Sequence, residues 1–319
     1  MKLKVCCTCS VYKMRKKDMM KKIKKNFLYS WQLYVMLIPA AVFLILFSYQ
    51  PMYGVQIAFR DFRVKDGIWG SEWVGLKHFI NFIHYPNFGR LMLNTLKIGL
   101  YGFATFPVSI IFALLLDEVR NQKFKKTVQM LSYIPHFLST VVVVSMLSLF
   151  CDAESGIFNT IIDFFGGQRQ NLMTVPKYFT HLYVWSGVWQ GVGWGAIIYV
   201  AALAGVQSEL IEAARIDGAG RFQIIRHVKI PAIMPTIVIM LILSCGGILS
   251  VGFDKIYLMQ NSLNLSVSQV IASYTYEIGL RGGQFSYSSA IGLFNTVINL
   301  VILNIVNVVA KKTTEIGIW

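Results

Sequence analysis

Charged side chains are scarce in this sequence. Asp, Glu, Lys and Arg make up 14% of the 319 residues, whereas a soluble domain of this length would have about 25%. Acidic residues are the scarcer kind, with 15 Asp and Glu against 30 Lys and Arg. So few charges cannot cover a soluble surface, which excludes an ordinary soluble globular protein.

Several catalytic patterns are also missing. The sequence has no His-Glu metal motif, no Gly-x-Ser-x-Gly and no pair of Asp residues within its apolar runs, which argues against an intramembrane enzyme. The apolar runs hold no acidic residue of the kind that an ion channel or proton-coupled carrier needs. A Gly-rich phosphate loop ending in Lys-Ser or Lys-Thr is absent as well, so we do not expect this chain to hydrolyse ATP.

Cysteine is rare, with five residues in all. Cys151 and Cys245 are isolated, so no disulfide framework is indicated. Cys6, Cys7 and Cys9 lie together in a basic arm, where they are either a metal cluster or an incidental reduced trio. No second Cys or His pair lies nearby to complete four ligands. We therefore predict neither a metal site nor a bound cofactor.

The sequence is instead rich in long apolar runs. Six of them are about long enough to cross a hydrocarbon core of roughly 30 Å as α-helices, which satisfy their own backbone hydrogen bonds in lipid. We predict an all-α integral membrane protein with spans at 33–50, 91–116, 128–150, 178–206, 230–253 and 284–310. The second span contains Lys97 and also Pro107, which should kink it.

The distribution of Lys and Arg predicts the orientation. The arm 1–31 carries ten, the loop 117–127 four, the loop 207–229 four and the tail 311–319 two, all on one side of a six-span protein. The three opposite loops together carry nine. Positive residues favour the cytoplasmic side, so both termini are predicted to be cytoplasmic. This bias explains most of the net charge of +15, and we expect contact with membrane lipid and none with nucleic acid.

A further uncharged run, 256–276, is a different case. It holds seven polar side chains, which would be costly in lipid. They are Gln260, Asn261, Ser262, Asn264, Ser266, Ser268 and Gln269. We predict an external loop or a re-entrant element buried in protein.

Two places near the outer ends of spans are candidate parts of a substrate pathway. The fourth span carries Trp185, Trp189, Gln190, Gly191 and Trp194. Trp185 and Trp189 are four residues apart and share a helix face, and aromatic rings beside an amide suit sugar rings. Ordinary helix packing is the alternative explanation of the same Trp and Gly residues, and spacing alone favours it.

The end of the fifth span is the second such place. It carries Gly252, Asp254 and Lys255. The two charges are either a solvated interface pair or the rim of a cavity, and spacing does not choose between these interpretations.

The loop 207–231 carries the most specific pattern. Ala213 and Ala214 favour a helix of little bulk, Gly218 and Gly220 permit a sharp turn, and a second helix, 221–228, should then lead to Pro231 at the start of the next span. A plain connecting loop would not need a helix, a glycine break and a second helix. We predict a docking element whose polar side chains contact a partner: Glu212, Arg215 and Asp217.

At these residues the chain resembles the permeases of binding-protein-dependent ABC importers. Glu212, Ala213, Ala214 and Gly218 match the signature loop at the right spacing, and 228–231 reads Val-Lys-Ile-Pro where the family has Ile-x-Leu-Pro. The segments 51–62, 73–79 and 93–95 resemble the carbohydrate branch, of the polysaccharide or complex-oligosaccharide type of Gram-positive bacteria. The resemblance covers residues 30–315 or so.

The resemblance implies the fold, the partners and the function. The fold would be a type I importer permease in the bacterial plasma membrane, paired with a second homologous permease, most simply as a heterodimer. Two partner ATPases would bind ATP and magnesium and contact the loop at Glu212, Ala213, Ala214, Arg215, Asp217, Gly218 and Ala219. An external lipoprotein would deliver an oligosaccharide. In maltose-type relatives the fourth and fifth spans contact sugar, which points to the two places named above.

The cargo has an alternative. A permease for peptides, amino acids or phosphate would share the loop, but the external Pro-Met-Tyr-Gly (51–54) and Trp-Val-Gly-Leu (73–76) segments argue against it. The maltose pattern is rich in Asn where this chain has Asp254 and Lys255. Lys255 would suit an acidic, uronate-bearing sugar or, alternatively, would pair with Asp254.

Overall fold

The computed structural model describes residues 29–319. These residues divide into two units, with the boundary between Gln56 and Ile57. In the first unit, α2 (Trp31–Leu44) continues through a π-helical turn, η1 (Ile45–Tyr49), into α3 (Gln50–Met52) and the start of η2 (Tyr53–Phe59). None of the residues of α2, η1 or α3 is buried within the chain, which is the state expected of an apolar span whose neighbours are lipid or another chain.

The second unit is a bundle of helices with one short hairpin. The hairpin pairs β1 (Arg60–Asp61) antiparallel with β2 (Glu72–Trp73), and α4 (Gly67–Gly70) lies between the two strands. The helices that follow are α5 (Lys77–Ile83), α6 (Phe88–Ala104), α7 (Phe106–Asp117), α8 (Gln122–Tyr133), η3 (Ile134–Phe137), α9 (Thr140–Phe150), α10 (Ile157–Phe164), α11 (Pro176–Ala204), α12 (Ser208–Ile216), α13 (Arg221–Ile224), η4 (Ile225–Lys229), α14 (Ile230–Cys245), α15 (Phe253–Met259), α16 (Leu265–Ser268), α17 (Ile271–Tyr276), η5 (Glu277–Arg281) and α18 (Phe285–Thr314).

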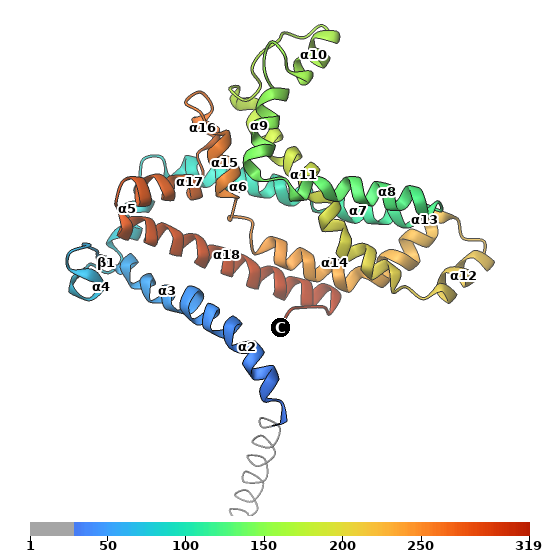
Figure 1. Cartoon of the computed structure of the whole chain (residues 1–319), viewed down its shortest axis with the longest axis horizontal. Helices are drawn as coiled ribbons and strands as arrows, with labels where there is room; N and C mark the ends of the chain where they lie inside the picture. Colours follow the sequence, from blue (N-terminus) through green and yellow to red (C-terminus); the bar gives the residue numbers. More distant parts are fainter. Residues whose placement is uncertain (1–28) are drawn as a thin grey trace, which may run out of the picture. The chain divides into compact units, whose positions relative to one another are not determined.

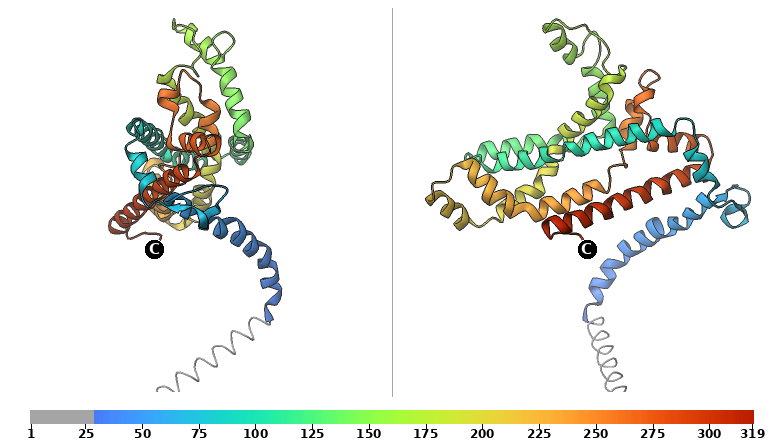
Figure 2. Two further views of the ribbon diagram at one scale, coloured as in Figure 1. Left: turned by 90° about the vertical axis from the view of Figure 1, so that its left-hand side faces the viewer. Right: turned by 180° about the vertical axis from the view of Figure 1, so that it is seen from behind.

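Five helical runs among the described residues are long and apolar enough to cross a membrane. They are Trp31–Phe59, Phe88–Asp117, Pro176–Ala204, Arg221–Cys245 and Phe285–Thr314. The sixth candidate is the pair Gln122–Phe137 and Thr140–Phe150, which is bent by 101°. Figures 1 and 2 show α9 turning sharply away from α8.

The bend corrects the prediction of one straight span over 128–150. Pro135 has no N–H group to continue an α-helix, and η3 forms there. Leu138 is extended, and the hydroxyl of Ser139 accepts a hydrogen bond from the Val142 N–H at 3.4 Å, so a new helix begins. Hydropathy alone does not reveal this break, since none of these residues is charged.

Breaks also affect two other spans. The second is interrupted at Thr105, close to Pro107, where a kink was expected, and α7 begins at Phe106. The fifth, predicted to run to 253, ends at Cys245. Beyond it the backbone turns, and the Leu249 N–H donates to Asn299 Oδ1 of α18 at 3.2 Å. This bond to α18 holds the non-helical segment, so the span is shorter than its apolar sequence suggests.

The polar run 256–276 forms three short helices, and several of its polar side chains are buried within the protein. Asn264, Ser268 and Ser273 are fully buried. The Asn264 amide donates to the carbonyls of Met173 and Met259, both at 3.0 Å, and Gln260 Nε2 donates to the Ser268 carbonyl at 2.7 Å. Protein groups satisfy these polar atoms, so they need not face lipid.

The core lies where α11 meets its neighbours. One apolar cluster joins α6, α9, α11 and α15 through buried residues such as Ile98, Val143, Phe179 and Ile256. A second joins α7, α11 and α14. α14 in turn packs against α18 (Figures 1 and 2). α11 is therefore the central helix of the second unit.

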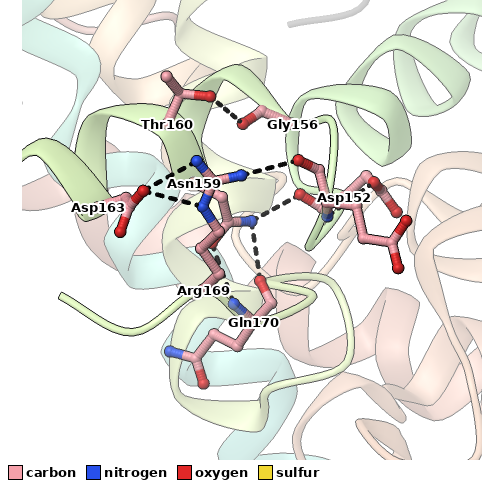
Figure 3. Close-up of polar contacts among 8 residues, drawn as sticks. Asp152, Gly156, Asn159, Thr160, Asp163, Arg169 and Gln170 are labelled. Atoms are coloured by element: carbon pink, nitrogen blue, oxygen red, sulfur yellow. Dashed lines mark hydrogen bonds and ion pairs between the residues drawn. The ribbon is translucent and has the colours of Figure 1, made fainter.

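The segment between α9 and α11 is held by polar contacts (Figure 3). Asn159 is fully buried. Its amide nitrogen donates to the carbonyls of Asp152 at 2.7 Å and Gln170 at 2.9 Å, and its oxygen accepts from the Gln170 N–H at 3.1 Å. Arg169 pairs with Asp163 at 2.9 Å. These bonds hold α10 in place together with Phe158 and Ile162, which pack against the apolar cluster that α9 and α11 share.

Candidate functional site

The loop 207–231 begins with an exposed helix. α12 has no buried residue, and it protrudes from one end of the second unit (Figure 1). Leu210 is 51% exposed and Ile216 is 86% exposed. Within the described part of the chain, Glu212, Arg215 and Asp217 make no ion pair. The predicted contact residues are therefore free to meet a partner, as a docking surface requires.

A left-handed glycine ends α12. Gly218 has φ +79°, and the Ala219 N–H donates to the Ala214 carbonyl at 2.9 Å, which is the hydrogen bond of a Schellman C-cap. The chain then turns at Gly220, whose N–H donates to Gln223 Oε1 at 2.7 Å. The glycine break predicted between two helices is therefore present.

The second arm of the loop differs from its predicted form. The helix expected at 221–228 does not stop before Pro231. α13, η4 and α14 form one continuous run from Arg221 to Cys245. Pro231 lies inside this run, just after the π-helical turn η4, and such a local change of helix type is one way in which a span accommodates proline. Any movement of this arm is therefore a movement of the span itself.

Lys229, at the base of the arm, is buried and paired with two acids. Its ammonium group donates to Asp117 Oδ2 at 2.7 Å and to Glu118 Oε1. Lys125 lies 3.8 Å from the same aspartate. This group of four, here called the Lys229 cluster, joins the loop to the end of α7. Sequence reasoning missed it, although an acidic pair directly after an apolar run was a visible signal.

A central cavity of about 520 Å³ lies between α7, α11 and α14. It brings together three of the predicted pathway residues, Gln190, Gly191 and Lys255. Gly252 borders an adjoining cavity of about 220 Å³ that shares Tyr183 and Ser244 with the first. The polar lining residues that sequence reasoning did not name are Thr105, Ser109, Tyr183, Tyr199 and Ser244.

The predicted tryptophans lie elsewhere. Trp185 and Trp189 share a face, as expected, but they line a separate cavity of about 720 Å³ with mainly apolar walls. Trp185 Nε1 donates to the Tyr101 hydroxyl at 2.8 Å. Trp194 stacks on His136 with ring centres 4.4 Å apart, which is a packing role. The structure therefore separates the aromatic residues from the amide of Gln190.

The two charges after the fifth span also separate. Lys255 Nζ donates to the Tyr183 carbonyl at 3.1 Å and lies 5.1 Å from the centre of the Tyr183 ring. Asp254 is exposed, and neither cavity that Lys255 or Gly252 lines includes it. No ion pair joins these two residues. Of the two interpretations left open by the sequence, the geometry favours the cavity.

The described residues contain no group of three or more His, Cys, Asp or Glu side chains that could hold a metal ion. Cys6, Cys7 and Cys9 lie outside these residues. The thiols of Cys151 and Cys245 are free and buried.

The bundle, the protruding loop and the cavity between spans define a helical membrane transport subunit. Residues 105–315 match the family described as the binding-protein-dependent transport system inner membrane component. The chain belongs to this family, which comprises the permease subunits of ABC importers. The predictions of an all-α membrane fold and of a multi-pass membrane location are confirmed.

Individual proteins and solved structures within this family are similar to the chain over most of its length. The chain is 43% identical over 305 residues, 95% of each chain, to the polygalacturonan/rhamnogalacturonan transport system permease protein YteP of Bacillus subtilis (strain 168). It is also similar to a chain of a bacterial ABC transporter involved in the import of the acidic polysaccharide alginate. The TM-score is 0.83 and the identity 33%, over 92% of this chain and 99% of that one. A chain of a bacterial alginate ABC transporter in complex with an alginate pentasaccharide-bound periplasmic protein gives a TM-score of 0.84 at the same identity and coverage.

Proposed function

We propose that this chain carries oligosaccharides, the breakdown products of a polysaccharide, through the permease part of an ATP-driven importer in the bacterial plasma membrane. The observation that carries the proposal is the similarity, over nearly the full length of both chains, to a permease named for polygalacturonan and rhamnogalacturonan. The excess of Lys and Arg on one side supports termini in the cytoplasm. A peptide or amino-acid cargo has no comparable support.

The loop 207–231 would couple transport to ATP hydrolysis on partner chains. α12 would seat in an ATPase through Glu212, Ala213, Ala214 and the turn at Gly218. Since the second arm continues into α14, and the Lys229 cluster ties its base to α7, displacement of α12 would move both spans together. Rigid-body movement of spans is the usual means of alternating access.

The remaining partners follow from the same assembly. A second, homologous permease would complete the pathway, two ATPases would bind ATP and magnesium, and an external lipoprotein would deliver the sugar. The related alginate transporter has been solved with a bound periplasmic protein, which supports the last of these.

The cargo is tested by uptake. Proteoliposomes containing the complete importer, with its binding protein, should accumulate labelled oligogalacturonides only when ATP is enclosed on the ATPase side. Peptides and amino acids should not accumulate. Accumulation of peptides or amino acids without oligosaccharide would refute the proposal that the cargo is an oligosaccharide.

The docking surface is tested by charge reversal. Glu212→Lys should abolish ATPase co-purification and uptake without reducing the amount of permease in the membrane. Glu209→Lys, one turn earlier on the same exposed helix, is the matched control and should retain most of both. Normal co-purification of the Glu212→Lys chain would refute docking at this surface.

A further inference from the structure

Among residues 29–319, Lys255 is the only cationic residue lining the central cavity. The neighbouring polar lining includes Ser109, Gln190 and Ser244. Its ammonium group has one hydrogen bond, to the Tyr183 carbonyl, and lies over the Tyr183 ring. An ammonium group can donate three hydrogen bonds, so Lys255 keeps donors for a ligand.

No carboxylate of the described residues neutralises this ammonium group. The ion pairs within residues 29–319 involve only the acids Asp61, Asp117, Glu118 and Asp163. Asp254 is adjacent in sequence, but side chains one residue apart on a helix do not face each other. None of the described residues that line the cavity is acidic. A charge withdrawn from water without a partner is costly, and burial lowers the pKa of Lys255 to about 8.

The backbone leaves room beside the ammonium group. A Cβ atom at Gly187 would lie 3.6 Å from Lys255 Nζ, so the glycine keeps that side of the cation open. The cavity volume of about 520 Å³ falls within the range of sites for small organic ligands, about 300–1,000 Å³. A sugar ring with one carboxylate would place its anion against Lys255 and its hydroxyls against Ser, Thr and Gln side chains.

We propose that Lys255 binds the carboxylate of an acidic sugar residue as it passes through this chain, and so selects uronate-bearing oligosaccharides over neutral ones. The inference rests on the proposed function, because it assumes that a saccharide enters the cavity. The cargo of the related alginate transporter is an acidic polysaccharide, which agrees with a cation in the pathway. A neutral sugar would leave the ammonium group without a counter-charge.

The test compares one oligosaccharide in two charge states. Proteoliposomes with the complete importer are given trigalacturonate or its fully methyl-esterified form, and initial ATP-dependent uptake is measured for each. The variants are Lys255→Met, which removes the charge at similar length, and Lys255→Arg, which keeps it. Lys97→Met is the matched control, since Lys97 is exposed on α6 and lines neither the central nor the adjoining cavity.

Lys255→Met should lower uptake of trigalacturonate by about tenfold or more, the change expected for one lost charge-assisted bond. Uptake of the ester should change by less than about twofold, because its weaker neutral bonds depend little on the charge. Lys255→Arg should stay near wild type, and Lys97→Met should alter neither. Equal losses of both sugars in Lys255→Met, or no loss of the acidic one, would overturn the inference.

Uptake by the wild-type importer distinguishes failure of the proposed cargo from failure of the proposed role of Lys255. If it accumulates the ester and not the acid, the oligosaccharide function stands and the role of Lys255 is refuted. If it accumulates neither, the proposed cargo fails and the inference fails with it.

Discussion

Gly218 sets the turn of the docking loop through its backbone alone. Its φ of +79° is one that side chains disfavour, yet no atom lies within 4 Å of the place where a Cβ would stand. A substitution therefore costs strain and no clash. Strain in this left-handed conformation is about 1–2 kcal/mol for an ordinary residue, and Asn is among the residues that tolerate it. Proline is excluded, since its ring fixes φ near about −65°.

Gly220 supplies the matched control two residues away. Its φ is −69°, and an added Cβ would meet only the flexible end of Gln223, at 3.6 Å. Alanine there should therefore carry none of the strain that it carries at Gly218, while changing the loop by the same single methyl group.

The assay is the affinity of the purified ATPase for permease complexes in nanodiscs. A strain of about 1–2 kcal/mol should weaken binding by about 5–30-fold in Gly218→Ala. Gly218→Asn should lose less affinity than Gly218→Ala, and Gly218→Pro should abolish binding. The affinity of Gly220→Ala should stay within about twofold of that of the wild type. Membrane yield of all four variants should be normal. Wild-type affinity in Gly218→Ala, or equal losses in Gly218→Ala and Gly220→Ala, would refute the argument that the left-handed turn sets the docking geometry.

Three further predictions concern polar contacts. Lys229→Met removes the buried cation between Asp117 and Glu118 and leaves only Lys125, at the edge of the cluster beside Asp117, at a cost of about 2 kcal/mol or more. We expect a lower melting temperature of the purified complex, recovered in part by adding Asp117→Asn and Glu118→Gln; no change in Lys229→Met would contradict a stabilising cluster. Asn159→Ala removes four hydrogen bonds from a fully buried side chain, so protease should cut the segment between α9 and α11 faster than in wild type. Equal cleavage rates would show that other contacts hold the segment. Because the pKa of Lys255 is lowered to about 8, its charge is lost as pH rises from about 7 to 9. The ratio of acidic to esterified uptake should therefore fall over that range in wild type and stay constant in Lys255→Arg, and a constant wild-type ratio would argue against the cation.

The sequence predicts the spans well because uncharged length is a property of each segment alone. It does not predict the course of the backbone where that course depends on contacts with other segments. The bend between α8 and α9 requires Leu138 to be extended and Ser139 to cap a new helix. The fifth span ends early where the Leu249 N–H is taken by Asn299, fifty residues away. Neither change alters the local hydropathy, so neither could be predicted from apolar run length.

The predicted pathway on α11 shows a different kind of limit. Trp185 and Trp189 are four residues apart and share a face, whereas Gln190 is one residue further and is turned by about 100°. Helix geometry thus predicts that the ring pair and the amide face different spaces, as the two cavities confirm. The sequence interpretation grouped them because they are close in the chain. Which of the two faces meets substrate depends on the neighbouring helices, which α11 alone does not reveal.

The two lysines that matter most show why charge must be judged in three dimensions. Lys255 has an acid beside it in the chain and pairs with none. Lys229 has no acid within ten residues on either side, yet it holds two carboxylates from the end of α7, more than a hundred residues away. The ammonium group of Lys255 can therefore still bind a ligand, whereas that of Lys229 is paired with carboxylates and joins two spans. We therefore expect selectivity to depend on Lys255 and coupling on Lys229. A charge-removing variant of each should separate the two roles: Lys255→Met should alter which sugar is carried, and Lys229→Met should alter the transport of every sugar alike.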